Sequence, residues 1–419
     1  MTSPAKHLAS RSPLYLLLAL LAASAFLLLI AGSSSAAPKP AVLSFKTARV
    51  TALGNASASI VPFEDAIYGS CGEAPETKKG CQGVGGVKHR YGIGELEVTV
   101  AQWVAFLNTV DPAGRNLRRL YSDSESPQAW PKYGQIGFAA KAGKGRHYTV
   151  ASPEWADKPY GFANFLRAAR FVNSLYNGEA LASKASSEGG FRFVTYRVRL
   201  SRRTETGMYD MRKRAPVRAH RAGFVLPSQD EWIKAAYYNP STGSYWKYPT
   251  NPGVFGAKET DAPAVTALDP SNGDVTNAGV QPLANWRSPD APAPSWCPTT
   301  ATPEACATVN PLGLDPQAYG LAFQGSLSTV GQALTRSPWG TLDQGGNAVE
   351  WTDTITPPPF GKKGARVWRR LHGGIANAPA YQLWLSAVGL QPQDNTFFTA
   401  TYPWLGFRIG VVGKPGSAG

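Results

Sequence analysis

A short glycine-containing stretch between two carboxylates, Asp343 and Glu350, most constrains how this chain can fold. It reads Gly345-Gly346-Asn347-Ala348-Val349-Glu350-Trp351-Thr352. Adjacent glycines allow a tight turn that exposes backbone carbonyls. Hard cations such as calcium take carboxylate and carbonyl oxygens from compact loops of this kind. The stretch therefore predicts either a calcium-binding turn or, as the alternative, a glycine turn capped by carboxylates without a metal.

The composition favours a packed core wrapped in long loops. The chain has 43 glycines and 34 prolines among 419 residues, more than an average globular protein. Its 12 tryptophans and 43% hydrophobic residues are enough to form a core, so wholesale disorder is not expected.

Capping residues and apolar repeats predict three amphipathic helices. Their expected N-caps are Thr99, Asn164 and Ser228. Thr99 and Ser228 are each followed, three residues later, by a Gln or Glu that completes a capping box. We expect the remainder of the chain to be loop, turn and short strand.

The amino-terminal segment has the features of an export signal. Lys6 and Arg11 precede an apolar run from Leu14 to Ala31, and small residues follow, with cleavage expected between Ala36 and Ala37. The alternative is an uncleaved signal anchor, because the run reaches the lower length limit for spanning a bilayer. Cleavage predicts a secreted, periplasmic or cell-envelope protein with no membrane attachment.

The four cysteines form two short-range pairs, Cys71 with Cys81 and Cys297 with Cys306. In the oxidising compartment that export implies, an even number of cysteines around short loops predicts two local disulfides. A zinc site is the alternative, but neither pair has the C-x2-C spacing that zinc sites favour.

Five segments, in the right order, resemble the formylglycine-generating enzyme family, also described as sulfatase-modifying factor domains. They are Glu97-Val98-Thr99 through Asn108, Phe224 through Trp232, the stretch from Gly345 to Thr352, Leu371-His372-Gly373-Gly374, and Leu405-Gly406-Phe407-Arg408-Ile409. The resemblance implies an α+β fold of the irregular, loop-rich C-type-lectin-like kind, with a few amphipathic helices and short antiparallel strands. It places this domain at residues 89–412, after a signal peptide (1–36) and an amino-terminal extension (37–88), with a flexible tail at 413–419.

The resemblance also indicates which chemistry is absent. Family members oxidise a sulfatase cysteine with molecular oxygen and a copper ion held by two cysteines, a soft-ligand site. The matching positions here are Ala378 and Leu383, so copper and catalysis are not expected. We expect a non-catalytic binding or structural module of the cell envelope. The alternative is an oxidoreductase of the same type that uses a different metal.

Two family calcium sites map onto this chain. The resemblance implies a structural calcium ligated by the Asp343 and Glu350 side chains and by the carbonyls of Gly346 and Ala348. It places a second site at Asn285, where the expected partner carboxylate is missing.

The charge pattern suggests an acidic partner. The chain carries a net charge of +14, and Arg192–Arg221 holds ten basic residues, a run that is otherwise typical of a solvated loop. Since an exported protein rarely meets nucleic acid, we expect a protein or an acidic glycan. The expected ligand residues are His372, Trp384 and Trp404, beside the lectin-like groove. The side chain of His372 is expected to be a solvated strand-end residue, and the alternative is an iron ligand.

Overall fold

The computed structural model describes residues 38–60, 81–129, 134–254, 261–269, 271–286, 327–356, 366–376, 380–385, 387, 389–394 and 404–415. Lys39–Gly419 form one compact unit. The segment with the predicted export signal lies outside the described residues. Helices and mainly antiparallel sheets occupy separate stretches of the chain, so the fold is irregular α+β, as predicted.

The three predicted helices are confirmed. They are α2 (Val100–Val110), α3 (Phe165–Tyr176) and α4 (Gln229–Tyr237). Each begins after the predicted N-cap, whose side chain accepts a backbone N–H three residues ahead: Thr99 from Gln102, Asn164 from Arg167 and Ser228 from Glu231. The two expected capping boxes are both present. Short 3-10 helices occur at Asp123–Glu125 (η3), Pro153–Trp155 (η4) and Ala380–Leu383 (η7).

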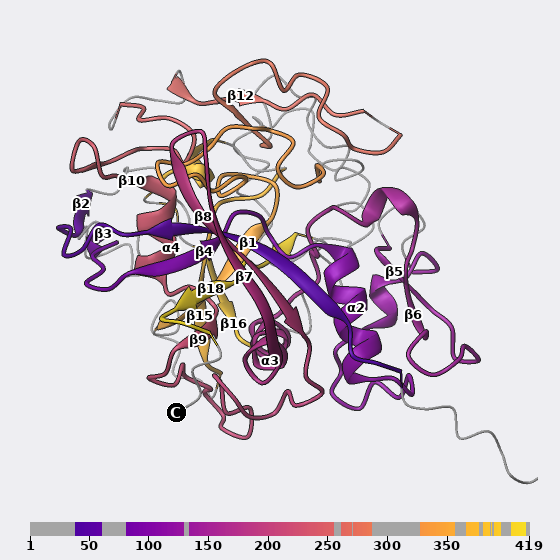
Figure 1. The fold of residues 1–419 in the computed structure, drawn as a ribbon. Helices are drawn as coiled ribbons and strands as arrows, with labels where there is room; N and C mark the ends of the chain where they lie inside the picture. Colours follow the sequence, from indigo (N-terminus) through magenta and orange to yellow (C-terminus); the bar gives the residue numbers. More distant parts are fainter. Residues whose placement is uncertain are drawn as a thin grey trace, which may run out of the picture. The chain divides into compact units, whose positions relative to one another are not determined.

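The larger sheet has six antiparallel strands in the order β7-β8-β1-β4-β18-β9 (Figure 1). The strands are β1 (Val42–Val50), β4 (Tyr91–Gly94), β7 (Glu179–Glu188), β8 (Phe191–Arg199), β9 (Gly223–Val225) and β18 (Gly410–Val412). Strand β1 comes from the predicted amino-terminal extension and pairs with both β4 and β8. The segment before residue 88 therefore supplies an interior strand of the sheet.

Strands β1, β7 and β8 are longer than the short strands predicted. Strand β7 is small and polar and almost entirely exposed, so it lacks the alternating burial that identifies strands in a sequence. Its backbone pairs with β8, which buries Phe193 and Val198. Three arginines of the basic run, at positions 192, 197 and 199, lie on β8. The basic run was interpreted as a solvated loop, and this is wrong for its first residues, 192–199, which form part of β8.

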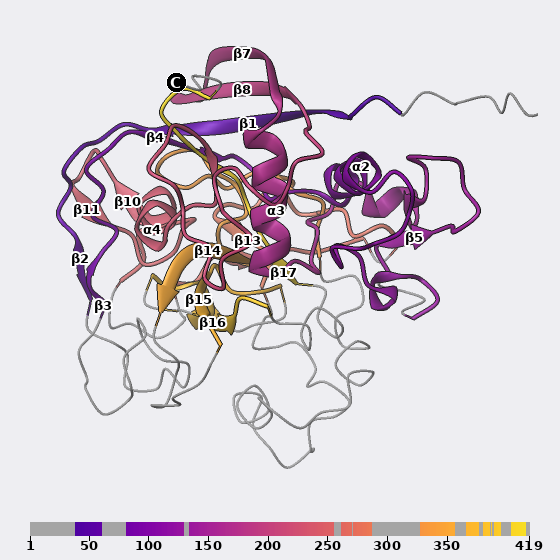
Figure 2. The ribbon, with the colours of Figure 1, turned by 90° about the horizontal axis from the view of Figure 1, so that it is seen from below.

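The smaller sheet has the order β16-β15-β14-β17. Its strands are β14 (Val349–Thr356), β15 (Trp368–His372), β16 (Gly389–Pro392) and β17 (Leu405–Gly406). In Figure 2, α3 and α4 lie between this sheet and the larger one. Both helices contact strands of the two sheets, α3 through β9 and β14 and α4 through β4, β14 and β15. The stretch from Gly345 to Thr352 therefore runs from a loop into β14, a strand that both helices contact.

Aromatic side chains fill the largest core, between α2, α3 and the sheets. Trp103 stacks on Tyr160 with ring centroids 4.2 Å apart and also contacts Phe106, Phe171 and Phe407. A second core packs Trp232 and Ile233 of α4 against β1 and β4. Four two-stranded ribbons complete the fold: β2–β3 (Ala58–Ile60, Cys81–Val84), β5–β6 (Ile136–Phe138, Tyr148–Val150), β10–β11 (Tyr238–Asn239, Ser244–Tyr245) and β12–β13 (Ala264–Val265, Leu283–Ala284).

Neither predicted disulfide can be followed in the structure. Cys71, Cys297 and Cys306 lie outside the described residues, and only the backbone of Cys81, in β3, is described. Both disulfides therefore stay predictions. In the part of the chain that the structure describes, no helix has the length and apolar character needed to cross a bilayer.

Candidate functional site

Glu350, a predicted calcium ligand, forms a fully buried ion pair with Arg408. Arg408 donates from Nε to Oε2 and from Nη2 to Oε1, both at 2.6 Å, and Trp232 Nε1 donates to Oε2 at 2.8 Å. Arg408 also donates to the carbonyls of Gly94, Glu95 and Leu342. Both carboxylate oxygens of Glu350 thus have protein partners, and its counter-charge comes from an arginine 58 residues away in the sequence.

Two further carboxyl groups lie in the same buried region. Burial raises the pKa of Asp343 to about 6, and the nearby Glu350 charge adds to this rise. Two contacts lower the same pKa. They are the Gly331 N–H, which donates to Asp343 Oδ2 at 2.5 Å, and the positive charge of Arg408. Burial, and then the Asp343 charge, raise the pKa of Glu97 well above its usual value. Among the described residues, Glu97 Oε2 has no hydrogen-bond partner. Three carboxyl groups therefore share one arginine.

Asn285 packs against this loop through backbone and side-chain contacts. Asn347 donates its backbone N–H to the Asn285 carbonyl at 2.9 Å, and Asn285 Nδ2 donates to Asn347 Oδ1 at 3.1 Å. Gly346 has a φ of +87°, and a Cβ there would lie 2.0 Å from the Asn285 oxygen, so only glycine fits. The structure thus brings Asn285 to buried Gly346, beside Ala348. No group of three or more His, Cys, Asp or Glu suited to a metal occurs within the described ranges.

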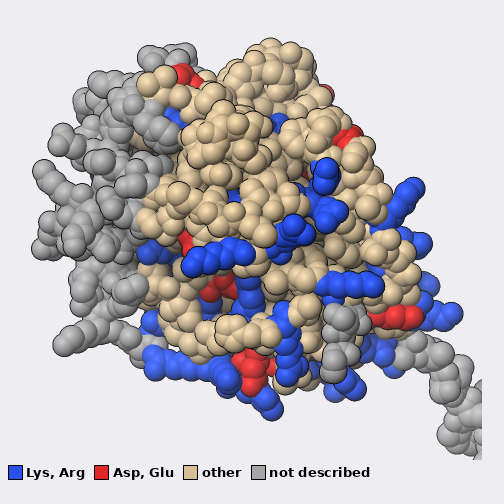
Figure 3. Space-filling view, turned by 60° about the vertical axis from the view of Figure 1, so that its left-hand side comes forward, with Lys and Arg blue, Asp and Glu red and all other residues tan. Residues whose placement is uncertain are grey.

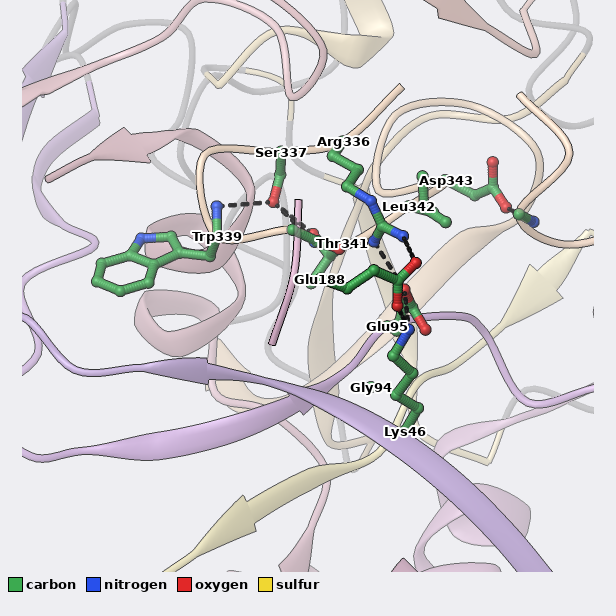
Figure 4. A network of polar contacts seen from close by, with 12 residues as sticks. Lys46, Gly94, Glu95, Glu188, Arg336, Ser337, Trp339, Thr341, Leu342 and Asp343 are labelled. Atoms are coloured by element: carbon green, nitrogen blue, oxygen red, sulfur yellow. Dashed lines mark hydrogen bonds and ion pairs between the residues drawn. The ribbon is translucent and has the colours of Figure 1, made fainter. Parts of the chain in front are cut away.

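A partly exposed ion-pair network anchors the segment before Asp343 (Figure 4). Arg336 pairs with Glu95 at 2.7 Å and with Glu188 at 3.3 Å, and Lys46 of β1 bridges the same two carboxylates. The backbone N–H of Leu342 donates to the Glu95 carbonyl at 2.8 Å. Because its partners come from β1, β7 and the segment before α2, no local sequence pattern could have predicted this network.

The three predicted ligand residues lie in different packing environments. The prediction of a solvated His372 is wrong: the side chain is 1% exposed and stacks on Trp232, with ring centroids 5.2 Å apart. Burial, followed by the Arg370 charge, lowers the pKa of His372 to about 3, so the imidazole is neutral. Trp384 is buried in a small core beside Leu383, and Trp404 is half-buried against the main core.

The resemblance places Ala378 and Leu383 at the positions of the copper cysteines, and of these two residues the structure describes only Leu383. Leu383 is fully buried, its carbonyl accepts from Tyr237 Oη at 2.9 Å, and it fills space beside Gly345. Ala378 lies outside the described residues. A leucine side chain supplies no metal ligand, so Leu383 serves packing.

A basic pocket of about 400 Å³ is lined by none of the predicted site residues. Four segments line it: α3, the connection between β8 and β9, the two residues before β15 and the two residues after β16. The lining residues are Leu166, Arg170, Met211, Lys213, Arg214, Arg366, Val367, Gln393 and Asp394. Four are cationic, one is acidic, and three are apolar. In Figure 3, Lys and Arg gather on the lower part of the face shown, at the level of the β8–β9 connection in Figure 1.

The four cations of the pocket are not equally available. Arg170 forms a bidentate pair with Glu205, both bonds at 2.9 Å, and Arg366 lies 3.4 Å from Asp394. Lys213 and Arg214 form no ion pair with any residue that the structure describes. The charges of Lys213 and Arg214 are therefore not balanced by direct contact with a described carboxylate.

Hydrogen bonds and a cation–π contact hold the four segments of the pocket together. Gln393 Nε2 donates to the Arg214 carbonyl at 2.5 Å, and the Gln393 backbone N–H donates to the Val367 carbonyl at 2.8 Å. Arg369 donates to Gln393 Oε1 and, at 2.5 Å, to the Pro216 carbonyl, with its guanidinium 3.6 Å from the centre of the Phe165 ring. Contacts among its lining segments and with the core residue Phe165 therefore define the shape of the pocket. Of its cationic residues, the sequence pattern indicated only Lys213 and Arg214, which belong to the basic run Arg192–Arg221.

Comparison with protein-family models finds no match, and comparison with curated proteins finds none. Among solved structures, Treponema denticola variable protein 1 is 15% identical, with a TM-score of 0.42 over 89% of this chain and 100% of that chain. A structure described as CarF is 14% identical, with a TM-score of 0.43 over 90% of this chain and 100% of that chain. Likeness at this level is weak and does not establish a family.

Proposed function

We propose that this chain is an exported, non-catalytic binding module that takes an acidic glycan in the basic pocket. We further propose that it is a divergent relative of formylglycine-generating enzymes with their C-type-lectin-like architecture, which the order of its five sequence segments supports. The observation that carries the binding proposal is the pocket itself, where Lys213 and Arg214 lack carboxylate partners among the described residues.

The lining of the pocket suits a sugar acid in two ways. Cationic side chains pair with carboxylate or sulfate groups, and arginine does so with two parallel hydrogen bonds. The apolar side chains of Leu166, Met211 and Val367 offer a surface for the less polar face of a sugar ring. This site replaces the expected groove at His372 and Trp384, because both of those side chains are buried.

The alternative, an oxidoreductase with a metal other than copper, draws on one observation. His372 is a buried, neutral imidazole, and neither ring nitrogen has a hydrogen bond of ordinary geometry to another described residue. A single imidazole is a poor metal site without further ligands at bonding distance. The binding module is therefore the better-supported proposal.

Charge reversal in the pocket tests the proposed function. Lys213→Glu combined with Arg214→Glu should weaken binding of size-defined dextran sulfate or oligogalacturonate on the order of tenfold to a hundredfold, because attraction becomes repulsion. Arg49→Glu with Lys184→Glu, on exposed positions of the larger sheet, changes the net charge equally and should leave affinity within about twofold. Equal losses in both double variants, or equal binding of neutral dextran, would refute the pocket as the site.

A structural calcium in the Asp343 loop is a second proposal, supported by the three buried carboxyl groups of Asp343, Glu97 and Glu350, which share the single positive charge of Arg408. Calcium binding would stabilise the folded protein by mass action, about 2.7 kcal/mol at a hundredfold excess over Kd. Calcium added to metal-stripped protein should raise Tm, and Asp343→Asn should abolish the rise. Glu350→Gln is a poor variant for this test because it also disturbs Arg408. An unchanged wild-type Tm would mean that Arg408 alone balances the carboxylates.

A further inference from the structure

The loop between α2 and β5 presents a leucine to solvent. Leu117 is 80% exposed, and no other large hydrophobic side chain of the described residues is as exposed. The residues on either side of the tip, Asn116 and Arg119, have φ angles of +48° and +52°, in the left-handed region that non-glycine residues rarely adopt. A backbone conformation of this kind persists only where the surrounding structure enforces it.

Hydrogen bonds at the base of the loop supply that enforcement. The backbone N–H of Asn116 donates to Asp111 Oδ2 at 2.7 Å, and its side chain exchanges two bonds with the Tyr121 backbone. The Arg119 carbonyl accepts from Arg167 Nε at 3.1 Å. These bonds hold the chain on both sides of Leu117, whose side chain lies in solvent.

A second apolar side chain lies on the adjacent β5–β6 hairpin. Phe138 of β5 is 37% exposed, and its ring stacks on Tyr121, with centroids 5.6 Å apart. In Figures 1 and 2 this hairpin lies beyond α2 as seen from the larger sheet. The hairpin and the leucine loop are joined by a bond of 2.7 Å from the Gly145 N–H to the Pro112 carbonyl.

Exposed cations lie on the same two segments as these apolar side chains. The leucine loop carries Arg115, Arg118 and Arg119, and the hairpin carries Lys141, Lys144 and Arg146, all of them exposed. Arg118 pairs with Glu205 at 2.8 Å. The other five form no ion pair with any carboxylate in the described part of the chain. The surface therefore combines outward apolar side chains with uncompensated positive charge.

We propose that this surface, defined by Leu117, Phe138 and the five unpaired cations, docks onto an anionic lipid bilayer. An exposed leucine gains free energy by entering the acyl boundary of a membrane. Each Lys or Arg near an anionic leaflet adds further attraction. A hydrophilic acidic glycan would use the charges but would leave Leu117 in water, so the apolar tip favours the lipid surface. The proposal concerns a face distinct from the basic pocket and does not depend on the glycan proposal.

Vesicle co-sedimentation of residues 38–419 tests the proposal without the apolar run at positions 14–31, which would bind lipid by itself. Residues 39–419 form a compact unit with their own cores, so this chain retains the fold. Vesicles of phosphatidylcholine with roughly one third phosphatidylglycerol should bind the protein, and phosphatidylcholine alone should bind it much less. Leu117→Ser should weaken the partition coefficient about tenfold. Arg115→Gln with Arg119→Gln should weaken it on the order of tenfold.

Leu334→Ser is the matched control. Leu334 is 60% exposed and also has a left-handed φ, of +58°, but the nearby Arg336 is bonded to Glu95 and Glu188. Leu334→Ser should bind vesicles as tightly as the unsubstituted protein does. All of these variants should have the same Tm as the unsubstituted protein. Equal binding to neutral and anionic vesicles, or full binding by Leu117→Ser, would overturn the proposal. So would competition by dextran sulfate together with a loss of vesicle binding confined to the pocket variant Lys213→Glu/Arg214→Glu, since that marks the pocket as the contact.

Discussion

Arg408→Met should lower the free energy of unfolding by about 3–5 kcal/mol, because it leaves the Glu350 carboxylate buried without its counter-charge. Both side chains are fully buried, and two bonds of 2.6 Å join them. The variant also leaves three backbone carbonyls without the donors of Arg408. Urea unfolding monitored by tryptophan fluorescence measures the change, with constant m values indicating that the unfolded states are comparable.

Arg212→Met is the matched control for that experiment. Arg212 forms the same two-bond contact with Asp210, at 2.8 and 2.9 Å, but on the surface. Surface pairs contribute little because water already solvates both charges. This variant should unfold at nearly the same urea concentration as the unsubstituted protein. Similar losses in the two variants would show that burial of the Glu350–Arg408 pair does not set its importance.

Glu231→Gln should lower the free energy of unfolding by about 3 kcal/mol at neutral pH. In this variant the free energy of unfolding should also fall less steeply as the pH is lowered. Burial alone would raise the pKa of Glu231, but the His89 hydrogen bond and the Arg218 charge outweigh it and lower the pKa to about 2. The group's ordinary pKa is 4.5. Because the folded state binds this proton more weakly, the stabilisation is present above about pH 4.5 and is lost as the pH falls towards 2.

Neighbouring groups define what this experiment reports. Arg218 bridges Glu231 and Asp353, with bonds of 2.7 Å to each. Asp230 lies in the same first turn of α4, but burial raises its pKa, so its effect on the pH profile has the opposite sign. Asp230→Asn is therefore the control, and urea midpoints between pH 3 and 7 are the readout. If the urea midpoint of the unsubstituted protein changed with pH as little as that of Glu231→Gln, Glu231 would not be the source of the acid-dependent loss of stability.

The sequence predicted the helices well because helix starts are local events. The capping residues Thr99 and Ser228 act on backbone groups within three residues, so a short window contains all the information needed. The long strands were missed for the converse reason. Strand β7 has no apolar alternation, and its pairing with β8 becomes visible only once the hairpin has formed.

The sites depended on contacts that no sequence window contains. Two like charges near the glycine turn suggested that a cation must balance them, and the structure supplies one, Arg408, from the closing segment of the chain. The sequence contained this arginine as part of a motif but did not reveal its partner. Likewise, the basic pocket assembles from segments around positions 170, 213, 366 and 393. Only three-dimensional packing could show that the basic run meets α3 and β15 there.

Amide hydrogen exchange of residues 38–419, with and without dextran sulfate, tests whether an acidic glycan binds in the basic pocket, because it locates the bound glycan on the fold. We expect slower exchange in the pocket segments 211–214, 366–367 and 393–394, and unchanged exchange at 371–374 around buried His372. Neutral dextran of the same length should leave every segment unchanged. Protection at 371–374 or at the Leu117 loop, with none at the pocket segments, would contradict the proposed function.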